Sequence, residues 1–320
     1  MQKNKRNVWA ARLMLATIVF AVSGCALFEK VKATVSALED SKVADNYEPS
    51  EQYYIGRGVS AVIVDKYPPV EVKDQTSEKQ ITYINEMACF IEAASKRVTR
   101  SAVKLGDYTS RSYDEQQHVY NLVLFKGIQV GLLQTDDVTA FATPGGFLWI
   151  SMGAVNMCEN EDELAAIIAH ELAHIILDHG MANYRTAYKG EIFSSTLSET
   201  WFSGDGLGAN FGRLVTTFAE DAFKGYNPEQ EFEADNWGTR AMAESGYAPD
   251  AMVKMLQRVE AYEKAHDVDP EDYLAHHPPI GDRIKAVQDL IKKENLKGNP
   301  NTMTPEGVTA RNTRFAETFK

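Results

Sequence analysis

The sequence predicts an α+β fold that is mostly helical, with a small sheet against a central helix. Helix start and stop signals bracket two segments, 160–180 and 227–246. Alternating apolar residues over 128–134 and 139–151 indicate strands. The 44% content of hydrophobic residues is enough for the core of one large domain.

The N-terminus predicts a lipoprotein signal peptide over residues 1–24. Basic residues precede the ten-residue apolar run "LMLATIVFAV", which is too short to span about 30 Å of hydrocarbon. The run is followed by "SGC", and Val22–Cys25 resembles a lipobox, in which Cys25 becomes the acylated N-terminus. Ala26 in place of aspartate after the cysteine resembles outer-membrane sorting, if the cell has two membranes. An ordinary signal peptide with a chance cysteine is the alternative.

The rest of the chain divides into three parts. Residues 25–75 read as an N-terminal helical segment, with helices near 29–45 and 50–66. Residues 76–295 form the main domain, which opens with a helix near 77–104 and continues with strands at 118–126 ("HVYNLVLFK") and 128–134. Residues 296–320 are polar without periodicity and predict a flexible tail.

The segment 160–180 predicts a helix through the core. Asn160 with Glu163 forms a capping box, and Gly180 is placed to end the helix. Nearly every position from Leu164 to Leu177 is apolar, so no face of this helix is suited to water.

Three polar residues interrupt that apolar run and point to a metal. His170 and His174 lie on one helical face with Glu171 beside them, and burying them without partners costs free energy. In the motif HExxH the two imidazoles bind zinc and the glutamate activates water. The alternative is a coincidental pair of satisfied core histidines. His179 lies on the opposite side of an uninterrupted helix, where it suits the helix C-terminus better than the metal.

The second bracketed helix offers a third ligand. Asn227 and Pro228 open it, and Gly246 closes it. Glu231 and Asp235 are one turn apart beside a stripe of small residues, so Glu231 is the candidate ligand and Asp235 the acceptor for the outer N–H of His170. The alternative is that Glu231 and Asp235 belong to an acidic, solvated face of this helix.

These motifs resemble the zinc metallopeptidases of the HtpX and CAAX-prenyl-protease type, peptidase family M48. The resemblance covers about residues 76–293 and rests on HELAH at 170–174, EFEAD at 231–235, "FATPGG" at 141–146 and "HPPIGDRI" at 277–284. It implies a zincin-like (gluzincin) fold, a zinc metallopeptidase domain over 76–295, and one zinc per chain with Glu231 as third ligand. Without the membrane spans of HtpX, the chain looks like the soluble, lipid-anchored bacterial branch.

Two residues of "HPPIGDRI" have predicted roles. Arg283 is a candidate for stabilising the oxyanion of the tetrahedral intermediate, with a surface salt bridge as the alternative. His277 precedes two prolines and is a candidate fourth, inhibitory ligand, with a hydrogen bond to the following helix as the alternative.

The strand pair around "FATPGG" is the candidate substrate site. A sheet edge beside the metal accepts an extended peptide as an added strand, and the edge residues are Phe141, Ala142, Gly145 and Gly146. Ordinary hairpin and core chemistry is the alternative.

The sequence thus predicts a zinc endopeptidase in the bacterial cell envelope, held by lipid at Cys25 and facing the periplasm from the outer membrane. Its expected substrates are unfolded or misassembled envelope proteins, and Glu171 is its general base. The alternative is a periplasmic chaperone or assembly factor working with the outer-membrane protein assembly machinery. A net charge of −12 disfavours nucleic acid. Sequence leaves open a Cys89–Cys158 disulfide, and whether the insertion at 181–226 is a packed helical hairpin or a lid.

Overall fold

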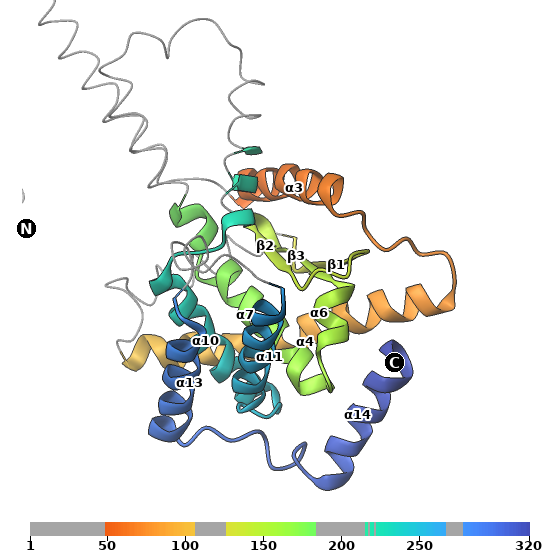
Figure 1. Cartoon of the computed structure of the whole chain (residues 1–320). Coiled ribbons are helices and arrows are strands. Elements are labelled where there is room, and N and C mark those ends of the chain that lie inside the picture. Colours follow the sequence, from red (N-terminus) through yellow and green to blue (C-terminus); the bar gives the residue numbers. More distant parts are fainter. Residues whose placement is uncertain (1–48, 106–125, 184–214, 217, 221, 267–277) are drawn as a thin grey trace, which may run out of the picture. The chain divides into compact units, whose positions relative to one another are not determined.

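The computed structural model describes residues 49–105, 126–183, 215–216, 218–220, 222–266 and 278–320 (Figure 1). All of them belong to one compact unit. The predicted signal peptide, Cys25, the predicted helix near 29–45, most of the strand predicted at 118–126, most of the insertion at 181–226 and His277 lie outside the described residues.

The described part is mostly helical, as predicted, and Figure 1 shows the helices around one small sheet. The helices are α3 (Pro49–Lys66), α4 (Gln75–Leu105), α6 (Met152–Met157), α7 (Glu161–Ile176), α10 (Pro228–Ser245), α11 (Ala251–Ala265), α13 (Ile280–Glu294) and α14 (Pro305–Phe319). The strands are β1 (Gln129–Leu133), β2 (Ala140–Thr143) and β3 (Phe147–Ser151), and the 3-10 turn η1 (Pro144–Gly146) joins the last two.

The sheet has the order β1-β3-β2, with β1 parallel and β2 antiparallel to β3. The β2–β3 turn requires positive φ at Gly145 (74°) and Gly146 (97°), which glycine adopts without steric cost. The outer side of β1 is covered, because the Val70 N–H donates to the Leu132 carbonyl (2.8 Å) and the Gln134 N–H to the Pro68 carbonyl (2.7 Å). Among the described strands, β2 forms the opposite edge of the sheet.

Helix α7 runs through the core, and all of its residues except Glu171 are buried. The Asn160 side chain caps it by accepting from the Glu163 N–H (3.0 Å). Helix α10 packs closely against it, because a Cβ on Gly238 would lie 3.1 Å from the backbone of Ala169. The small-residue stripe of α10 therefore admits a second helix, as its sequence indicates.

The predicted end of this helix at Gly180 is wrong. Helix α7 ends at Ile176, and Asp178 takes a left-handed conformation (φ 60°) before helical structure resumes at His179. Aspartate tolerates this conformation better than most non-glycine residues. The break changes the direction in which His179 projects.

The predicted flexible tail is also wrong from Pro305 onward. Thr304 caps helix α14 by accepting from the Gly307 N–H (3.1 Å). Phe315 and Phe319 are buried, and the Phe319 ring meets Tyr83 edge-to-face at 5.4 Å. Two aromatic residues one turn apart anchor an otherwise polar helix, a signal too sparse for a periodicity test.

Cys89 and Cys158 do not form a disulfide in the structure. Cys89 is exposed and Cys158 is buried, and both thiols are free.

Among the described helices, none combines the length and apolar character that crossing a membrane requires.

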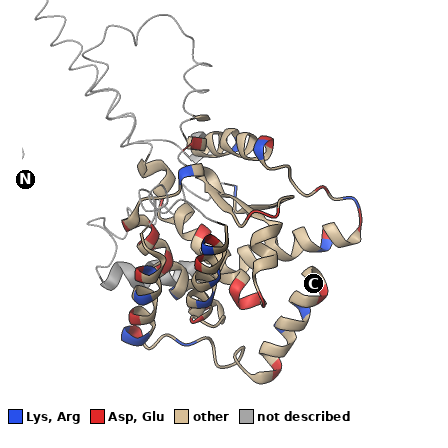
Figure 2. Ribbon diagram, in the orientation of Figure 1, with Lys and Arg blue, Asp and Glu red and all other residues tan. Residues whose placement is uncertain are grey.

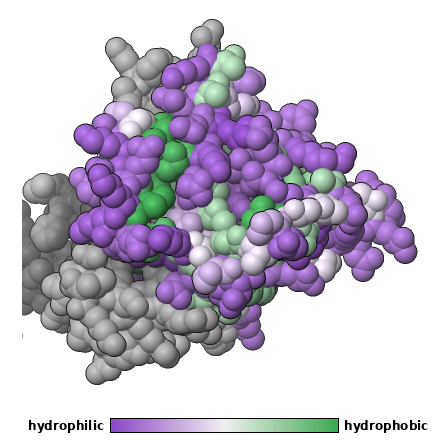
Figure 3. All heavy atoms as spheres, turned by 90° about the horizontal axis from the view of Figure 1, so that it is seen from below, coloured by the Kyte–Doolittle hydropathy of each residue, from purple (hydrophilic) through white to green (hydrophobic). Residues whose placement is uncertain are grey.

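The surface of the described part is mainly polar. Figure 2 shows acidic and basic residues interspersed over the helices, and the face in Figure 3 is largely hydrophilic with a few apolar residues between. The large apolar side chains that are most exposed are Tyr54, Val72 and Phe90.

Candidate metal centre

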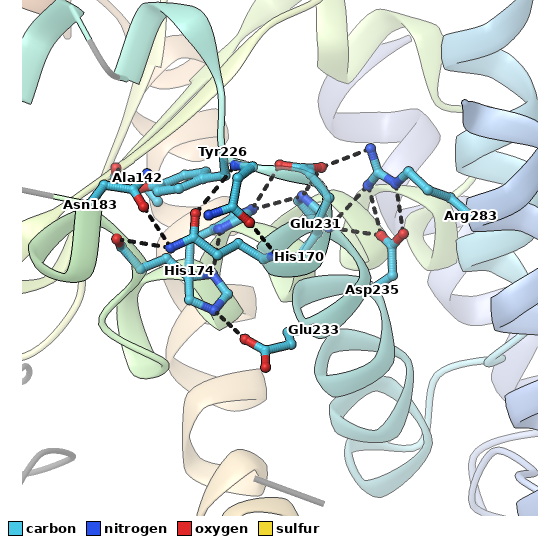
Figure 4. A network of polar contacts seen from close by, with 12 residues as sticks. Ala142, His170, His174, Asn183, Tyr226, Glu231, Glu233, Asp235 and Arg283 are labelled. Carbon is cyan, nitrogen blue, oxygen red and sulfur yellow. Dashed lines mark hydrogen bonds and ion pairs between the residues drawn. The ribbon is translucent and has the colours of Figure 1, made fainter. Parts of the chain in front are cut away.

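Two helices bring the predicted ligands together (Figure 4). His170 and His174 project from α7, and Glu231 projects from the first turns of α10. The two Nε2 atoms are 3.0 Å apart, and the Glu231 carboxylate oxygens lie 3.5 Å from His170 Nε2 and 3.6 Å from His174 Nε2. All three side chains are buried.

These distances fit zinc. Bonds of about 2.0–2.1 Å in a tetrahedral site place the ligand atoms roughly 3.3 Å from one another, close to the three distances observed here. Two imidazoles with one carboxylate are the donor set of one class of catalytic zinc site, in which the fourth position is open. The residues present therefore suit a catalytic rather than a structural zinc.

Asp235 lies beside the outer ring nitrogen of His170. Its Oδ1 is 2.9 Å from His170 Nδ1, so the imidazole presents Nε2 to the ligand cluster. Such a contact fixes the tautomer and orientation of a ligating histidine.

Arg283 binds the carboxylates behind the ligands. Its Nε donates to Asp235 Oδ2 (2.7 Å), Nη2 donates to Asp235 Oδ1 (2.8 Å), and Nη1 lies 2.8 Å from Glu231 Oε2. All three guanidinium nitrogens thus contact carboxylates, and the residue is buried. These contacts do not support the predicted oxyanion role, and they make Arg283 a clamp that orients Glu231 and Asp235.

The charges of this cluster shift its pKa values. Burial opposes the charged form of Asp235, but Arg283 and His170 outweigh it and lower the pKa of Asp235 to about 2. Burial likewise opposes ionisation of Glu231, and Arg283 together with His170 lowers the pKa of Glu231. Both carboxylates are therefore ionised at neutral pH, as ligand and hydrogen-bond acceptor must be.

Glu171 is the partially exposed residue of α7. Burial raises the pKa of its carboxyl to about 7, with the charge of Glu231 adding to the effect. A carboxylate that is protonated reversibly near neutral pH suits a group that accepts a proton and later returns it.

His179 contacts a ligand from behind, which the sequence does not reveal. Its Nδ1 lies 2.8 Å from His174 Nδ1, and its Nε2 lies 3.1 Å from Glu233 Oε2. With His174 Nε2 facing the cluster, His174 Nδ1–H donates to His179 Nδ1, and His179 Nε2–H donates to Glu233. The prediction that His179 only serves the helix C-terminus is wrong because the break at Asp178 turns its side chain toward His174.

Tyr226 is a second residue that sequence reasoning missed. Its ring lies flat on the His174 imidazole, with centroids 3.8 Å apart and planes 11° apart. Its hydroxyl donates to the Ala142 carbonyl (3.1 Å), which links the ligand to strand β2. The only sequence signal is its position directly before the N-cap of the helix that carries Glu231.

The predicted edge residues lie on β2 and the turn after it, and all four are buried. Both glycines have packing reasons for their identity, since a Cβ on Gly145 would lie 2.5 Å from the Tyr53 backbone and one on Gly146 2.6 Å from the Gly127 carbonyl oxygen. Substrate contact at Phe141 and Ala142 stays a prediction.

Known proteins agree with the geometry. Residues 116–291 match Peptidase family M48. The chain is 24% identical over 279 residues to mitochondrial metalloendopeptidase OMA1 of Saccharomyces cerevisiae, covering 85% of this chain and 73% of that protein. It is 21% identical over 222 residues to metalloprotease LoiP of Escherichia coli strain K12, covering 69% and 84%.

A further relative is much longer than the matched region. The chain is 25% identical over 187 residues to the beta-barrel assembly-enhancing protease of Yersinia pestis, which covers 56% of this chain and 37% of that protein. The family match spans more than half of this chain and includes both ligand helices. The chain therefore belongs to peptidase family M48 and is a zinc metalloprotease.

Proposed function

We propose that this protein is a gluzincin-type endopeptidase of the bacterial cell envelope, held by lipid at Cys25, that hydrolyses unfolded or misassembled envelope proteins. The observation that carries the proposal is a buried three-ligand cluster with a partially exposed glutamate beside it, close to the edge of a sheet. This arrangement provides a metal, a base and a backbone surface for an extended chain.

The ligand residues and the base divide the chemistry. His170, His174 and Glu231 would hold zinc, which when bound polarises a carbonyl and lowers the pKa of water toward about 7. Glu171 accepts the proton of the attacking water and delivers it to the leaving amine. Asp235 and Arg283 hold His170 and Glu231 in place throughout.

The sheet edge supports an endopeptidase with broad sequence tolerance. A peptide that adds to β2 is recognised through its backbone, so the pairing itself imposes little side-chain preference. Backbone pairing requires an extended chain, and unfolded proteins supply that conformation. Folded proteins keep most of their backbone groups paired internally.

The decisive experiment measures casein cleavage by the purified protein. Zinc-loaded protein should cleave casein, a chelator should abolish cleavage, and added zinc should restore it. Glu171→Gln should keep about one zinc per chain and lose at least about 100-fold in rate, because the shape stays and the base is gone. Glu229→Gln, at an exposed position of α10, is the matched control and should cleave like the unaltered protein. Substantial cleavage by Glu171→Gln would disprove the role of Glu171.

The lipid anchor is a separate part of the proposal, and Cys25 lies outside the described residues. The short apolar run and the "SGC" sequence support it. Cys25→Ala should abolish acylation and leave the protein uncleaved or free of the membrane. Mass spectrometry of the mature N-terminus measures this directly, and an unmodified start downstream of Cys25 would contradict the anchor.

The name of one relative suggests an alternative function for this chain. The name of the Yersinia pestis relative includes assembly of β-barrels. A role for this chain in assembling outer-membrane proteins is therefore the second candidate, with proteolysis subordinate. Complementation separates the two, since Glu171→Gln would retain a chaperone function and lose a proteolytic one. The interspersed charges in Figure 2 and the net charge of −12 disfavour nucleic acid as a partner.

A further inference from the structure

The edge strand β2 has a definite row of outward backbone groups. The Ser151 N–H donates to the Thr139 carbonyl (3.0 Å). Because hydrogen-bonded pairs alternate along an antiparallel ladder, the pairs Phe141–Trp149 and Thr143–Phe147 also face each other with their N–H and C=O groups. The alternate pairs, including Ala142 opposite Leu148, turn their N–H and C=O groups away from β3. The Ala142 carbonyl is therefore one of the acceptors that an added peptide strand would use.

That acceptor is occupied. The Tyr226 hydroxyl donates to the Ala142 carbonyl at 3.1 Å, as Figure 4 shows. Ala142 is only 4% exposed, and Phe141 before it is 6% exposed. Water and a peptide are both kept from this part of the edge.

The same residue lies against the metal ligands. The Tyr226 ring is stacked on His174 at 3.8 Å, so the hydroxyl caps the edge strand at the position next to the ligand cluster. Three residues earlier, Phe223 meets Phe141 edge-to-face at 5.5 Å. The stretch from Phe223 to Tyr226 thus covers β2 by two contacts, one apolar and one polar.

The position of Tyr226 along the chain limits how it can move. Asn227, the next residue, caps α10 in a complete capping box with Gln230, and the ligand Glu231 follows. On the other side, Gly225 has a positive φ of 86°, a conformation that glycine adopts readily. Rotation about the Tyr226 side chain withdraws the hydroxyl without disturbing the cap or Glu231.

From these contacts we propose that Tyr226 controls access to the peptide-binding edge, because its hydroxyl occupies the Ala142 carbonyl that a substrate strand needs next to the metal. This inference rests on the proposed peptidase function. A peptide gains its hydrogen bond at Ala142 only by displacing or sharing the tyrosine contact. If the contact is shared, the ring stays on His174, and if it is displaced, the ring and the hydroxyl leave together.

The test measures binding rather than cleavage. The probe is fluorescein-labelled casein, and the protein is the zinc-loaded Glu171→Gln variant, which holds the peptide without cutting it. Adding Tyr226→Phe removes the hydroxyl and keeps the stacked ring. Because one neutral hydrogen bond contributes about 0.5–1.5 kcal/mol net, we expect binding to tighten about 2- to 13-fold, with zinc content unchanged.

Tyr54→Phe in the same background is the matched control, since Tyr54 is 58% exposed on α3, and it should leave the affinity unchanged. Equal or weaker casein binding by Tyr226→Phe, or no measurable binding by either protein, overturns the inference. Failure of the proposed function looks different, because zinc-loaded protein with Glu171 intact would then bind casein and leave it uncut. The binding comparison still decides the role of Tyr226 in that case.

Discussion

The two ends of helix α7 both bury charged groups, and they do so in different ways. At the N-terminal end, Glu161 is fully buried and accepts hydrogen bonds from Tyr83, from Tyr247 (3.1 Å) and from the Arg314 guanidinium (2.6 Å). Arg258 likewise donates to Glu163 (2.6 Å). At the C-terminal end, two imidazole nitrogens and a carboxylate converge on one point.

The difference separates a structural cluster from a metal site. Each carboxylate in the first turn of α7 is paired with an arginine side chain or a tyrosine hydroxyl, so its charge is compensated within the protein. The nitrogens His170 Nε2 and His174 Nε2 instead face each other at 3.0 Å, where a cation satisfies both. Buried charge alone does not identify a functional site, whereas convergence of lone pairs does.

Replacing one arginine at each end of α7 tests this difference with the largest expected effects. Arg283→Met leaves Glu231 and Asp235 without their shared cation, and loss of a partner from a buried pair costs about 3–5 kcal/mol. We expect a lower free energy of unfolding in urea for the metal-free protein, together with reduced zinc content. Normal zinc content and stability would show that Arg283 is dispensable as a clamp.

Arg314→Met is the matched change at the other end. Glu161 keeps both tyrosine hydroxyls, and the Arg314 side chain is 56% exposed, so we expect a smaller loss of about 1–2 kcal/mol. Zinc content and casein cleavage should stay at the level of the unaltered protein at temperatures where the variant is folded. A loss of zinc here would mean that the two ends of α7 are coupled.

His179→Gln tests the contact behind His174 at the C-terminal end of α7. Removing an outer partner of a ligating histidine commonly costs about 10- to 100-fold in metal affinity or activity, and we expect an effect in this range. Zinc affinity is measured by competition with a chelator of known strength. His266→Gln, at an exposed histidine, is the control. Unchanged zinc affinity in His179→Gln would show that the contacts from His174 through His179 to Glu233 contribute only to packing.

The smallest effect is expected at a partly exposed ion pair. A hydrogen bond from Arg240 lowers the pKa of Glu294 below its ordinary value. A lowered pKa means that the stabilisation is present above about pH 4.5 and is lost as pH falls through the lowered value. Such partly exposed pairs contribute about 0–1 kcal/mol, so Glu294→Gln should reduce stability slightly at pH 7 and by less at pH 3, in urea unfolding at both pH values. An equal loss at both would exclude the ion pair as its cause.

The sequence by itself determined the helices and strands whose signals are local. The N-cap of α7, both caps of α10, the strands predicted within 128–134 and 139–151, and the helices near 50–66 and 77–104 follow from patterns within a few residues, and the structure has them. It also predicted the candidate ligands that the structure brings together, because HExxH fixes two imidazoles on one helical face and ExxAD supplies a carboxylate with its neighbouring acceptor.

Only the tertiary structure decided what lies behind and beside those ligands. Arg283 clamps a carboxylate 48 positions away, and Tyr226 bonds a carbonyl 84 positions away. A single left-handed residue, Asp178, turned His179 toward His174, and two buried phenylalanines made a helix of the expected tail. Such contacts depend on which surfaces meet after folding, and their free energy comes from burial and pairing between distant segments, which local propensity and periodicity do not contain.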